Sequence, residues 1–371
     1  MVRVVCDELE RASKAPRDPF EFHDGDVVGV TESILARTQG NFVALDDITA
    51  DVRRLTPEGD MALIFPLLSR NRFGRMLSAF AEGVRGKLHL LLSYPTDEVG
   101  NRLVDPLVFH ANAGRIKGDL FSEREYDEVF GRCPHPFTGV DYVDFYKRMN
   151  PEKIEIHFAN NPLSALTFSS TVIVASIHSR HLHREILERA GATVFTLDQF
   201  CAAPRADGKG YNEEYGLLGS NFSGEDSVKL FPRESAKFAR ALADELRTRT
   251  GRRIEVLVYG DGAFKDPAAG IWELADPVVS PGYTEGLEGL PKEIKFKYIA
   301  DNPGDRTPEE AVKEAIKSKG EMDRSAGRAL GTTPRRLTDL LGSLCDLVSG
   351  SGDRGTPVVH ISGYFDSYID E

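Results

Sequence analysis

The sequence has no long apolar run, no surplus of basic residues and no closely spaced pair of cysteines. No apolar stretch approaches the roughly 20 residues that a membrane helix requires, so we expect no membrane-spanning segment. Residues 1–10 become acidic too early for a signal peptide, which favours a cytoplasmic protein. The formal net charge of −12 would repel a phosphate backbone, so nucleic acid is not an expected partner.

The cysteines are few and scattered. Cys6, Cys133, Cys201 and Cys345 lack CxxC spacing, which argues against a structural zinc site and a disulfide framework and fits a reducing cytoplasm. Hydrophobic residues make up 41% of the chain and charged residues 28%, as in ordinary soluble globular proteins. With 371 residues the chain exceeds the usual size of one domain, so we expect two domains or one domain with a large insertion.

The most informative stretch ends in a glycine-flanked acid. Residues 254–259 form a β-branched apolar run that predicts a core strand, and Gly260-Asp261-Gly262 follows it. The glycines allow a phosphate or a metal to approach the backbone closely, and Lys265 adds a positive charge to the same loop. A carboxylate and a lysine at a strand end suit a metal–nucleotide site. The alternative is a plain hairpin turn, since Asp-Gly is a strong turn signal.

A strand followed by a helix is predicted near the N-terminus. Residues 27–30 form the strand and 32–37 the helix, which Gly40 ends. Arg37 falls in the last helical turn, where the helix dipole favours a cation, and this would be its role without any ligand. Residues 41–45 return as a second strand.

The segment from about 61 to 210 has the pattern of a small α/β unit. The expected elements are a helical region at 65–84, strands at 87–94 and 153–159, and a β-α-β signature with a strand at 171–177, a helix at 180–190 and a strand at 193–197. Turn-rich sequence near 70 and 210 marks its ends.

Three histidines stand close together at the start of the helix over 180–190. His178 and His181 are three residues apart and can share a face, whereas His183 points elsewhere and no cysteine lies nearby. A metal cluster is one interpretation. The spacing favours the alternative, a helix-terminal or substrate-facing role.

Helices are also predicted in the C-terminal part of the chain. One covers 234–249 and has Gly251 as its C-cap. The capping box Thr307-Pro308-Glu309-Glu310 predicts a second over 308–318. A third begins at Thr333-Pro334 and stops at Gly350.

A glycine-rich loop at 349–356 precedes a predicted strand at 357–361. Loops of this composition can turn successive N–H groups toward an anion. The loop is neither a Walker A loop nor a Rossmann fingerprint, because neither spacing is present. A flexible connector is the alternative.

Four segments, taken in order, resemble the coenzyme F420-0:L-glutamate ligase (gamma-glutamyl ligase) family. They are residues 24–40, 216–221, 250–265 and 337–363. The resemblance covers residues 20–65 and 215–365, and the stretch between them is much longer than the family norm. It implies an α/β (α+β) fold with a mixed-sheet ligase core formed by 1–70 and 211–371, and an inserted α/β lobe formed by 71–210.

The resemblance also implies an activity. The family consists of amide ligases that typically use GTP and a divalent metal and that form homodimers. For this chain the resemblance implies GTP or ATP, Mg²⁺ or Mn²⁺, and a homodimer. The expected substrates are an acidic small molecule and an amino acid, with L-glutamate as the expected amine. Joining them requires activation of the carboxylate, most simply as an acyl phosphate.

The resemblance assigns roles to particular residues. Asp261 matches a metal-binding carboxylate, Asn221 a nucleotide contact and Arg37 the family's phosphate-side lysine. Arg37 and Lys265 would stabilise the phosphates during transfer. The loop over the nucleotide corresponds to Gly350, Ser351, Gly352, Gly355 and Thr356.

Two acidic positions of the family are not acidic in this chain, because they fall on Leu218 and Ser351. The available substitutes are Asp353, Glu225, Asp226 and Asp339. We assign Asp353 as the second metal ligand because it lies in the glycine loop, two residues after Ser351. The substrate stays open, since the insertion can reshape the acceptor pocket. The alternatives are a ligase of the same mechanism with another acceptor or amine, and a nucleotide-binding protein without catalysis.

Overall fold

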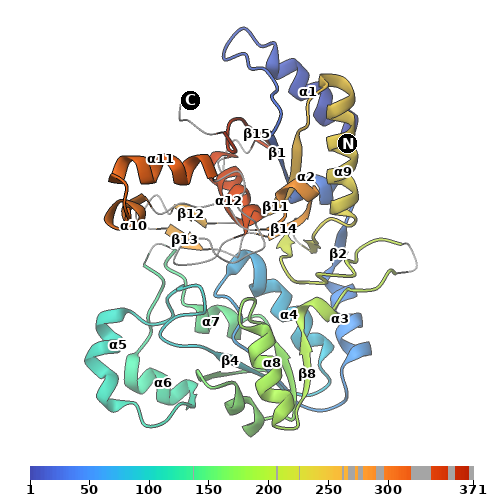
Figure 1. The fold of residues 1–371 in the computed structure, drawn as a ribbon. Helices are drawn as coiled ribbons and strands as arrows, with labels where there is room; N and C mark the ends of the chain where they lie inside the picture. The colour runs from blue at the N-terminus through green and yellow to red at the C-terminus, as the bar shows by residue number, and fades with distance from the viewer. Residues whose placement is uncertain are drawn as a thin grey trace. The chain divides into compact units, whose positions relative to one another are not determined.

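The computed structural model describes residues 1–136, 138–205, 208–224, 226–260, 263–265, 272–274, 279–289, 296–318, 336–349 and 356–366. Residues 71, 72, 263–265, 272–274 and 279 are described by their backbone alone. Helices alternate with strands that form several sheets, of which the two largest have mixed strand directions, and this confirms the expected α/β (α+β) fold (Figure 1). Within this described part of the chain, no helix is long and apolar enough to cross a membrane.

The chain divides into two compact units. Unit 1 comprises Met1–Leu35, Glu234–Gly262 and Val278–Glu371, and unit 2 comprises Ala36–Arg233 and Ala263–Pro277. Each unit has its own apolar core, because every cluster of buried apolar side chains lies wholly within one unit. The domain division expected from the sequence, at residues 70 and 211, stays a proposal.

A four-stranded sheet with the order β14-β11-β1-β15 is the centre of unit 1. Its strands are β1 (Val27–Thr31), β11 (Glu255–Gly260), β14 (Val279–Tyr283) and β15 (Val358–Ile361). The two central strands, β1 and β11, are parallel, whereas β14 and β15 are antiparallel to their neighbours. Every residue of β11 is buried, as its β-branched apolar run predicts.

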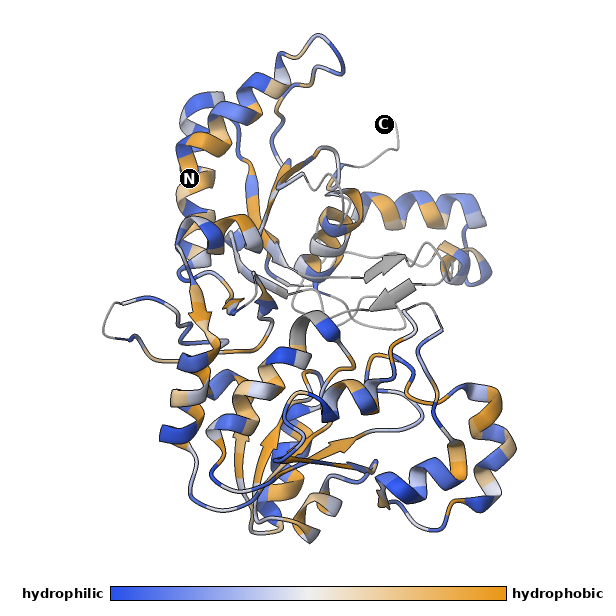
Figure 2. Ribbon diagram, turned by 180° about the vertical axis from the view of Figure 1, so that it is seen from behind, coloured by the Kyte–Doolittle hydropathy of each residue, from blue (hydrophilic) through white to orange (hydrophobic). Residues whose placement is uncertain are grey.

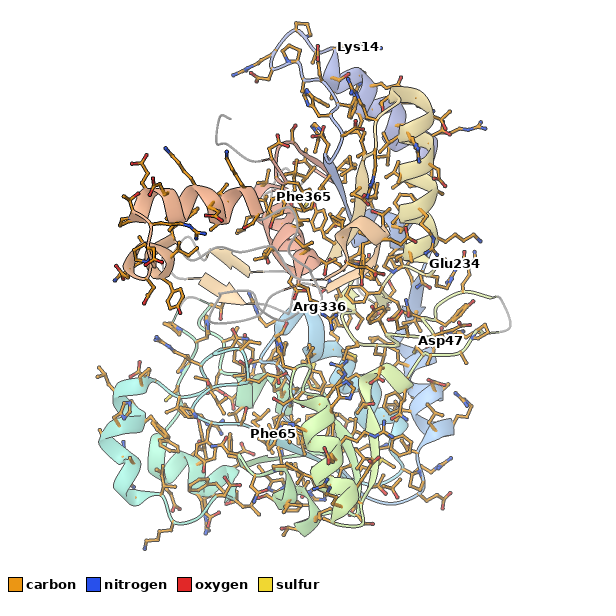
Figure 3. All side chains as sticks on the ribbon, viewed as in Figure 1. Lys14, Asp47, Phe65, Glu234, Arg336 and Phe365 are labelled. Carbon is orange, nitrogen blue, oxygen red and sulfur yellow. The ribbon has the colours of Figure 1, made fainter. Side chains whose placement is uncertain are left out.

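Helices cover both faces of this sheet. They are α1 (Val2–Ser13), α9 (Ser235–Thr250) and α12 (Leu337–Ser349). Unit 1 also contains α10 (Phe296–Asp301) and α11 (Pro308–Ser318), which contact each other, and a 3₁₀ turn at Glu285–Leu287. α1 and α9 pack with Val28 and Val30, on one side of β1. α12 packs on the other side, where Cys345 lies against Gly29 so closely that a Cβ there would overlap its sulfur. α9 follows Glu234, whose backbone is left-handed (Figure 3).

A buried polar group closes the amino end of β1. Asp26 is only 1% exposed and accepts hydrogen bonds from the His23 N–H at 2.9 Å and from Ser362 Oγ at 2.7 Å. His360 Nε2 lies 2.8 Å from Oδ2 of Asp26. Burial by itself would raise the pKa of Asp26, but the hydrogen bonds of these three residues lower the pKa below its ordinary value.

Unit 2 contains a six-stranded sheet with the order β5-β6-β4-β3-β7-β8. Its strands are β3 (Met61–Ile64), β4 (Leu88–Leu92), β5 (Phe121–Ser122), β6 (Ile154–Phe158), β7 (Thr171–Val174) and β8 (Thr193–Thr196). All pairs are parallel except β5 with β6. Numbered along the chain without β5, the parallel strands have the order 3-2-1-4-5 of a doubly wound sheet. Such sheets are buried on both faces, and these strands are accordingly strongly apolar (Figure 2).

Helices and two small sheets complete unit 2. The helices are α3 (Leu45–Leu55), α4 (Arg75–Gly83), α5 (Pro106–Asn112), α6 (Glu123–Phe130), α7 (Tyr142–Lys147) and α8 (Arg180–Arg189), with a π turn at Arg70–Gly74 and 3₁₀ turns at Ala113–Arg115, Pro162–Thr167 and Leu197–Gln199. α2 (Glu32–Thr38) begins in unit 1 and ends in unit 2. The small sheets join β2 (Phe42–Ala44), β10 (Ser227–Lys229) and β9 (Asn221–Phe222), and β12 (Ala263–Lys265) with β13 (Trp272–Leu274).

Most predicted elements are confirmed, and two helices begin later than predicted. α12 begins at Leu337, and its predicted start at Thr333-Pro334 lies outside the described residues. The predicted helix at 308–318 is α11, and Gly251 ends α9 with a φ of 70°. The helical region expected at 65–84 begins only at Arg70, and its α-helical part at Arg75. Phe65 has a left-handed backbone with a φ of 53°, and the Leu68 N–H donates to the Asp97 carboxylate at 2.9 Å, so these residues do not form helical hydrogen bonds. The sequence reasoning also missed α1 and α3.

Candidate functional site

One edge of the unit 1 sheet brings together chain segments that are distant in sequence. β1 and β11 are parallel and in register at Thr31 and Tyr259, so both strands end at this edge. The antiparallel strands begin there, since Val279 of β14 pairs with Gly260 and Val358 of β15 pairs with Val30. We call this edge, formed by Thr31, Gly260, Val279 and Val358, the strand-end edge.

The strand-end edge is where three of the sequence-predicted segments attach. Asp261 follows Gly260 directly, the helix that carries Arg37 follows Thr31, and the glycine loop ends just before β15. The Thr31 N–H donates a hydrogen bond to the Pro357 carbonyl at 2.9 Å, which ties the end of β1 to the end of that loop. Asp261, Gly350, Ser351, Gly352, Asp353 and Gly355 lie outside the described residues, and Lys265 is described by its backbone alone.

Thr356 is the one residue of the assigned nucleotide loop that the structure describes. It is exposed, and its N–H donates to the Ser349 carbonyl at 3.2 Å. Ser349 is the last residue of α12, so this hydrogen bond joins the two ends of the loop. The loop is therefore closed at its base by a helix end and a strand start.

Two further polar side chains at the strand-end edge were not singled out from the sequence. Glu32 is 2% exposed and begins α2, where the helix dipole favours a negative charge. Tyr259 is buried and pairs with Thr31, the residue before Glu32, and burial raises the pKa of its hydroxyl to about 12, so it stays protonated near neutral pH. A buried carboxylate at a strand end is the signal that could have identified Glu32, but its burial is not evident in the sequence.

Neither Leu218 nor the residues proposed to replace the missing carboxylates were placed in space by the sequence. Leu218, which the sequence resemblance matches to an acidic position, is 6% exposed and packs in the apolar core of unit 2. Asp339 lies in the first turn of α12 and accepts a hydrogen bond from the Arg336 N–H at 3.4 Å. Asp226 is exposed, and Glu225 lies outside the described residues.

Asn221 and Arg37 belong to unit 2. Asn221 lies on β9 and pairs with Lys229 on β10, which in turn pairs with Phe42 on β2. Lys229 is 3% exposed, so this small sheet holds an almost fully buried ammonium group beside Asn221. The sequence reasoning missed Lys229. Arg37 is exposed in the last turn of α2, as predicted from the sequence.

The Arg233 side chain holds the chain segment that follows α2. Arg233 donates through Nη1 to Asn41 Oδ1 at 2.6 Å and lies 4.8 Å from the centre of the Tyr211 ring. Its backbone N–H donates to Gln39 at 2.8 Å, and Gln39 donates back to its carbonyl at 2.8 Å. Arg233 therefore fixes the segment between α2 and β2 and is a structural residue.

The three clustered histidines do not come together as metal ligands among the residues that the structure describes. His178 and His181 are exposed, and His183 Nδ1 lies 2.8 Å from Ser176 Oγ with its ring against Phe65. The amino end of α8 is already filled, because the Glu98 carboxylate accepts the N–H groups of residues 177–179.

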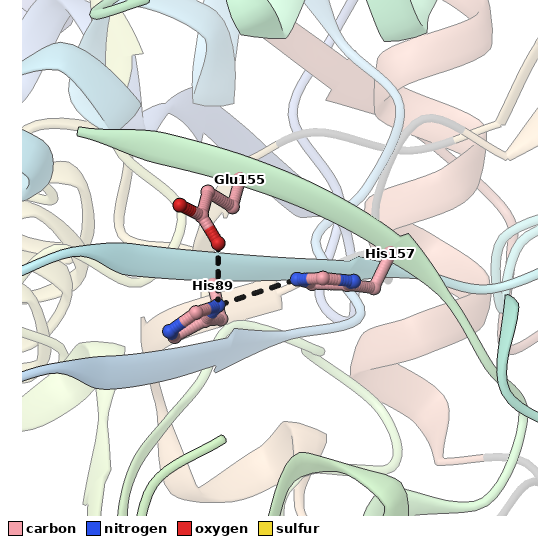
Figure 4. A group of neighbouring side chains, drawn as sticks. All are labelled: His89, Glu155 and His157. Atoms are coloured by element: carbon pink, nitrogen blue, oxygen red, sulfur yellow. Dashed lines mark hydrogen bonds and ion pairs between the residues drawn. The ribbon is translucent and has the colours of Figure 1, made fainter. Parts of the chain in front are cut away.

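A different group of histidines gathers on the six-stranded sheet. His89 on β4 and His157 on β6 lie 3.2 Å apart between Nδ1 and Nε2, and Glu155 Oε2 lies 3.5 Å from the same Nδ1 (Figure 4). Burial, and after it the neighbouring His89, lower the pKa of His157 to about 4, so its imidazole is neutral near pH 7. The sequence reasoning missed this group entirely.

Comparison with known proteins identifies a family. The model of the family described as F420-0:Gamma-glutamyl ligase matches residues 1–363, nearly the whole chain and including the segment expected to be an insertion. No curated protein matches the chain.

Proposed function

The chain belongs to the F420-0:gamma-glutamyl ligase family, and from this premise we propose that it is a nucleotide- and divalent-metal-dependent amide ligase. The proposed reaction adds an amino acid, with L-glutamate as the expected amine, to an acidic small molecule. The family membership supports a ligase of this kind. The nucleotide, the metal and the acyl phosphate are our proposals.

The observation that carries the proposal is the convergence at the strand-end edge. Three segments that resemble the family's site motifs attach where β1 and β11 end and β15 begins. Ligands of open α/β sheets bind outside the carboxyl ends of the parallel strands. The end of β11, which leads into Asp261, and the base of the glycine loop therefore suit a nucleotide site.

The proposed chemistry has two steps. First, an oxygen of the acceptor carboxylate attacks the γ-phosphorus of GTP or ATP, the bond to the β-phosphate oxygen breaks, and an acyl phosphate and a nucleoside diphosphate result. Then the amine nitrogen attacks the acyl carbon, the C–O bond to phosphate breaks, and the nitrogen loses a proton. In phosphoryl transfer most of the rate comes from positioning and from charge stabilisation.

The proposed roles follow from charge. Arg37 and Lys265 would stabilise the negative charge that spreads over the transferred phosphoryl group. Asn221 would contact the nucleotide, and the backbone of Gly350, Ser351, Gly352, Gly355 and Thr356 would line the phosphates. Lys229, almost fully buried beside Asn221 in unit 2, would position that side chain.

The donor chemistry of this chain fits Mg²⁺ or Mn²⁺. Asp261 and Asp353 supply the carboxylate oxygens that these hard cations prefer, and Glu32 is a further carboxylate at the strand-end edge. A bound divalent cation would neutralise phosphate charge.

One observation favours a second candidate. Leu218 is packed in an apolar core, so the family's acidic position there cannot supply a ligand in this chain. The site would then hold a different acceptor or amine with the same mechanism, or would bind nucleotide without catalysis. The expected homodimer and the cytoplasmic location also stay proposals, which gel filtration and cell fractionation test.

The test compares turnover with binding in Asp353→Ala. Release of nucleoside diphosphate is measured with GTP and ATP over a panel of acidic acceptors and amines, beside a nucleotide titration on the same protein. We expect turnover to be abolished and nucleotide binding to weaken only modestly, while the exposed control Asp305→Ala keeps both. Full turnover in Asp353→Ala would refute its assignment, and no turnover in the parent over the whole panel would favour the binding protein.

A further inference from the structure

We propose that His89, Glu155 and His157 form a second metal site in unit 2, suited to Zn²⁺ and separate from the proposed nucleotide site. The proposal does not depend on the ligase activity. It starts from strand register: β4 and β6 are parallel neighbours in which His89 pairs with Glu155 and Leu91 pairs with His157. Side chains that are opposite each other, or two residues apart on one strand, share a face of the sheet. All three side chains therefore lie on the same face.

The distances between the ligand atoms fit a tetrahedral ion. His89 Nδ1 lies 3.2 Å from His157 Nε2 and 3.5 Å from Glu155 Oε2, and the three ligand atoms all lie within 4.8 Å of one another. Zinc binds imidazole nitrogen at about 2.0–2.1 Å and carboxylate oxygen at about 2.0–2.2 Å, so two of its ligands are about 3.3–3.5 Å apart. Two of the three separations already have this length. The ion would sit between the three atoms and keep one position for water.

The surroundings hold the ligands in place. The Phe168 ring stacks on both imidazoles, with centroid distances of 3.9 Å to His157 and 4.7 Å to His89. Asp60 Oδ2 lies 4.0 Å from Nε2 of His89, the nitrogen that would not bind the ion. A carboxylate near that nitrogen is the usual outer partner of a metal-bound histidine. Asp60 is itself fixed, because its Oδ1 accepts the Lys87 N–H at 2.7 Å.

The group is open to solvent on the side of Glu155. The side chain of Glu155 is 43% exposed, whereas that of His89 is 11% exposed, so an ion can enter past the carboxylate. Lys87 Nζ lies 3.7 Å from Glu155 Oε1, which leaves Oε2 toward His89. Two imidazoles and one carboxylate suit Zn²⁺ and related transition metals better than Mg²⁺, which prefers oxygen ligands alone.

The position predicts what the ion would do. His89 and Glu155 are the second residues of β4 and β6, and His157 is the fourth of the five residues of β6, so the group lies within the strands, on a face of the sheet. Ligands of doubly wound sheets bind beyond the carboxyl ends of the strands. The ion would therefore bridge β4 and β6 and stabilise unit 2. A hydrogen bond between the imidazoles of His89 and His157 is the arrangement that competes with this site.

The test is a zinc titration of the full-length, chelator-treated protein in excess Mg²⁺, which occupies sites made of oxygen ligands. We expect one equivalent of Zn²⁺ to bind and to raise the Tm of unit 2 by roughly 5 °C at saturation. His157→Gln and Glu155→Gln should each weaken zinc binding by roughly 100-fold, and His183→Gln, a histidine of the same unit outside the group, should leave it unchanged.

A coordination readout separates lost ligands from lost folding. Co²⁺ bound in place of Zn²⁺ should give visible absorption bands in the parent and in His183→Gln, and these bands should disappear in His157→Gln while the circular dichroism spectrum is unchanged. Absence of zinc binding by the parent would overturn the proposal. Zinc binding of equal affinity in the parent and in both Glu155→Gln and His157→Gln would overturn it as well.

Discussion

The two units carry their polar chemistry at different places on their sheets. In unit 1 the predicted site segments attach where β1 and β11 end, the usual place for a ligand of an α/β sheet. In unit 2 the His89–Glu155–His157 group lies on a face of the sheet, and the Glu98 carboxylate accepts the N–H groups of the residues that follow β7. We therefore propose the reaction site in unit 1, and in unit 2 an ion site away from the strand ends.

The comparison treats the units as separately stabilised, and two core substitutions test this most strongly. Leu90 in unit 2 and Leu257 in unit 1 are both fully buried in different cores. Leu90→Ala and Leu257→Ala should each lower the free energy of unfolding of their own unit by about 3 kcal/mol, because each leaves a cavity. Scanning calorimetry should show two transitions, of which each variant lowers one. A single transition lowered equally by both variants would contradict separate stability.

A buried charge gives the next largest effect and concerns unit 1. Asp26→Asn should cost about 3 kcal/mol, because it disturbs the buried group formed with His23, His360 and Ser362. The lowered pKa of Asp26 means that its contribution is present above the unfolded-state pKa, about 3.9, and is lost as pH falls through the folded-state pKa. Urea unfolding at a series of pH values measures this loss of stability.

The pH series has a direct control. Asp26→Asn should lose the part of the acid destabilisation that belongs to unit 1, whereas the exposed Asp18→Asn should keep it. Equal acid sensitivity of the parent and Asp26→Asn would show that other carboxylates are responsible.

The packing of α12 on the sheet of unit 1 can be tested at a glycine. Gly29→Ala should cost about 2 kcal/mol, because the new Cβ would overlap Cys345 Sγ. In the double variant with Cys345→Ala part of this cost should disappear, giving a coupling energy of about 1 kcal/mol. Strictly additive effects in urea unfolding would mean that α12 does not lie on β1 at this point.

The smallest expected effects on stability concern two matched capping boxes, one in each unit. Ser122 with Glu125 caps α6 in unit 2, and Thr307 with Glu310 caps α11 in unit 1. Ser122→Ala and Thr307→Ala should each cost about 1 kcal/mol, and each loss should appear only in its own unit. A loss below the error of the unfolding measurement at either position would show that the cap there is redundant.

The sequence predicted local features of the fold well because their causes are local. The capping box at Thr307 fixed the start of α11, and the β-branched run before Gly260 predicted β11. α3 was missed because residues 45–55 follow a short strand without a clear break, and α4 was started too early because the apolar run continues from β3.

The candidate sites also differ in whether their causes are local in the sequence. Asp261 and the glycine loop stand out because glycine and acid are adjacent in the sequence. His89 and His157 are 68 residues apart and meet only because β4 and β6 pair, and strand pairing is not evident from either segment alone. The buried positions of Glu32 and Lys229 likewise depend on tertiary packing.

The most direct test of the central claim, that the strand-end edge of unit 1 holds a metal–nucleotide site, is a calorimetric titration of GTP and of ATP into the parent and Asp261→Asn, with and without Mg²⁺. The parent should bind nucleotide with metal. Asp261→Asn should stay folded and lose metal-supported binding by at least about 10-fold, because it lacks the carboxylate proposed to hold the metal. Unchanged nucleotide affinity in Asp261→Asn with Mg²⁺ would contradict the claim and leave Asp261 as the residue of a hairpin turn.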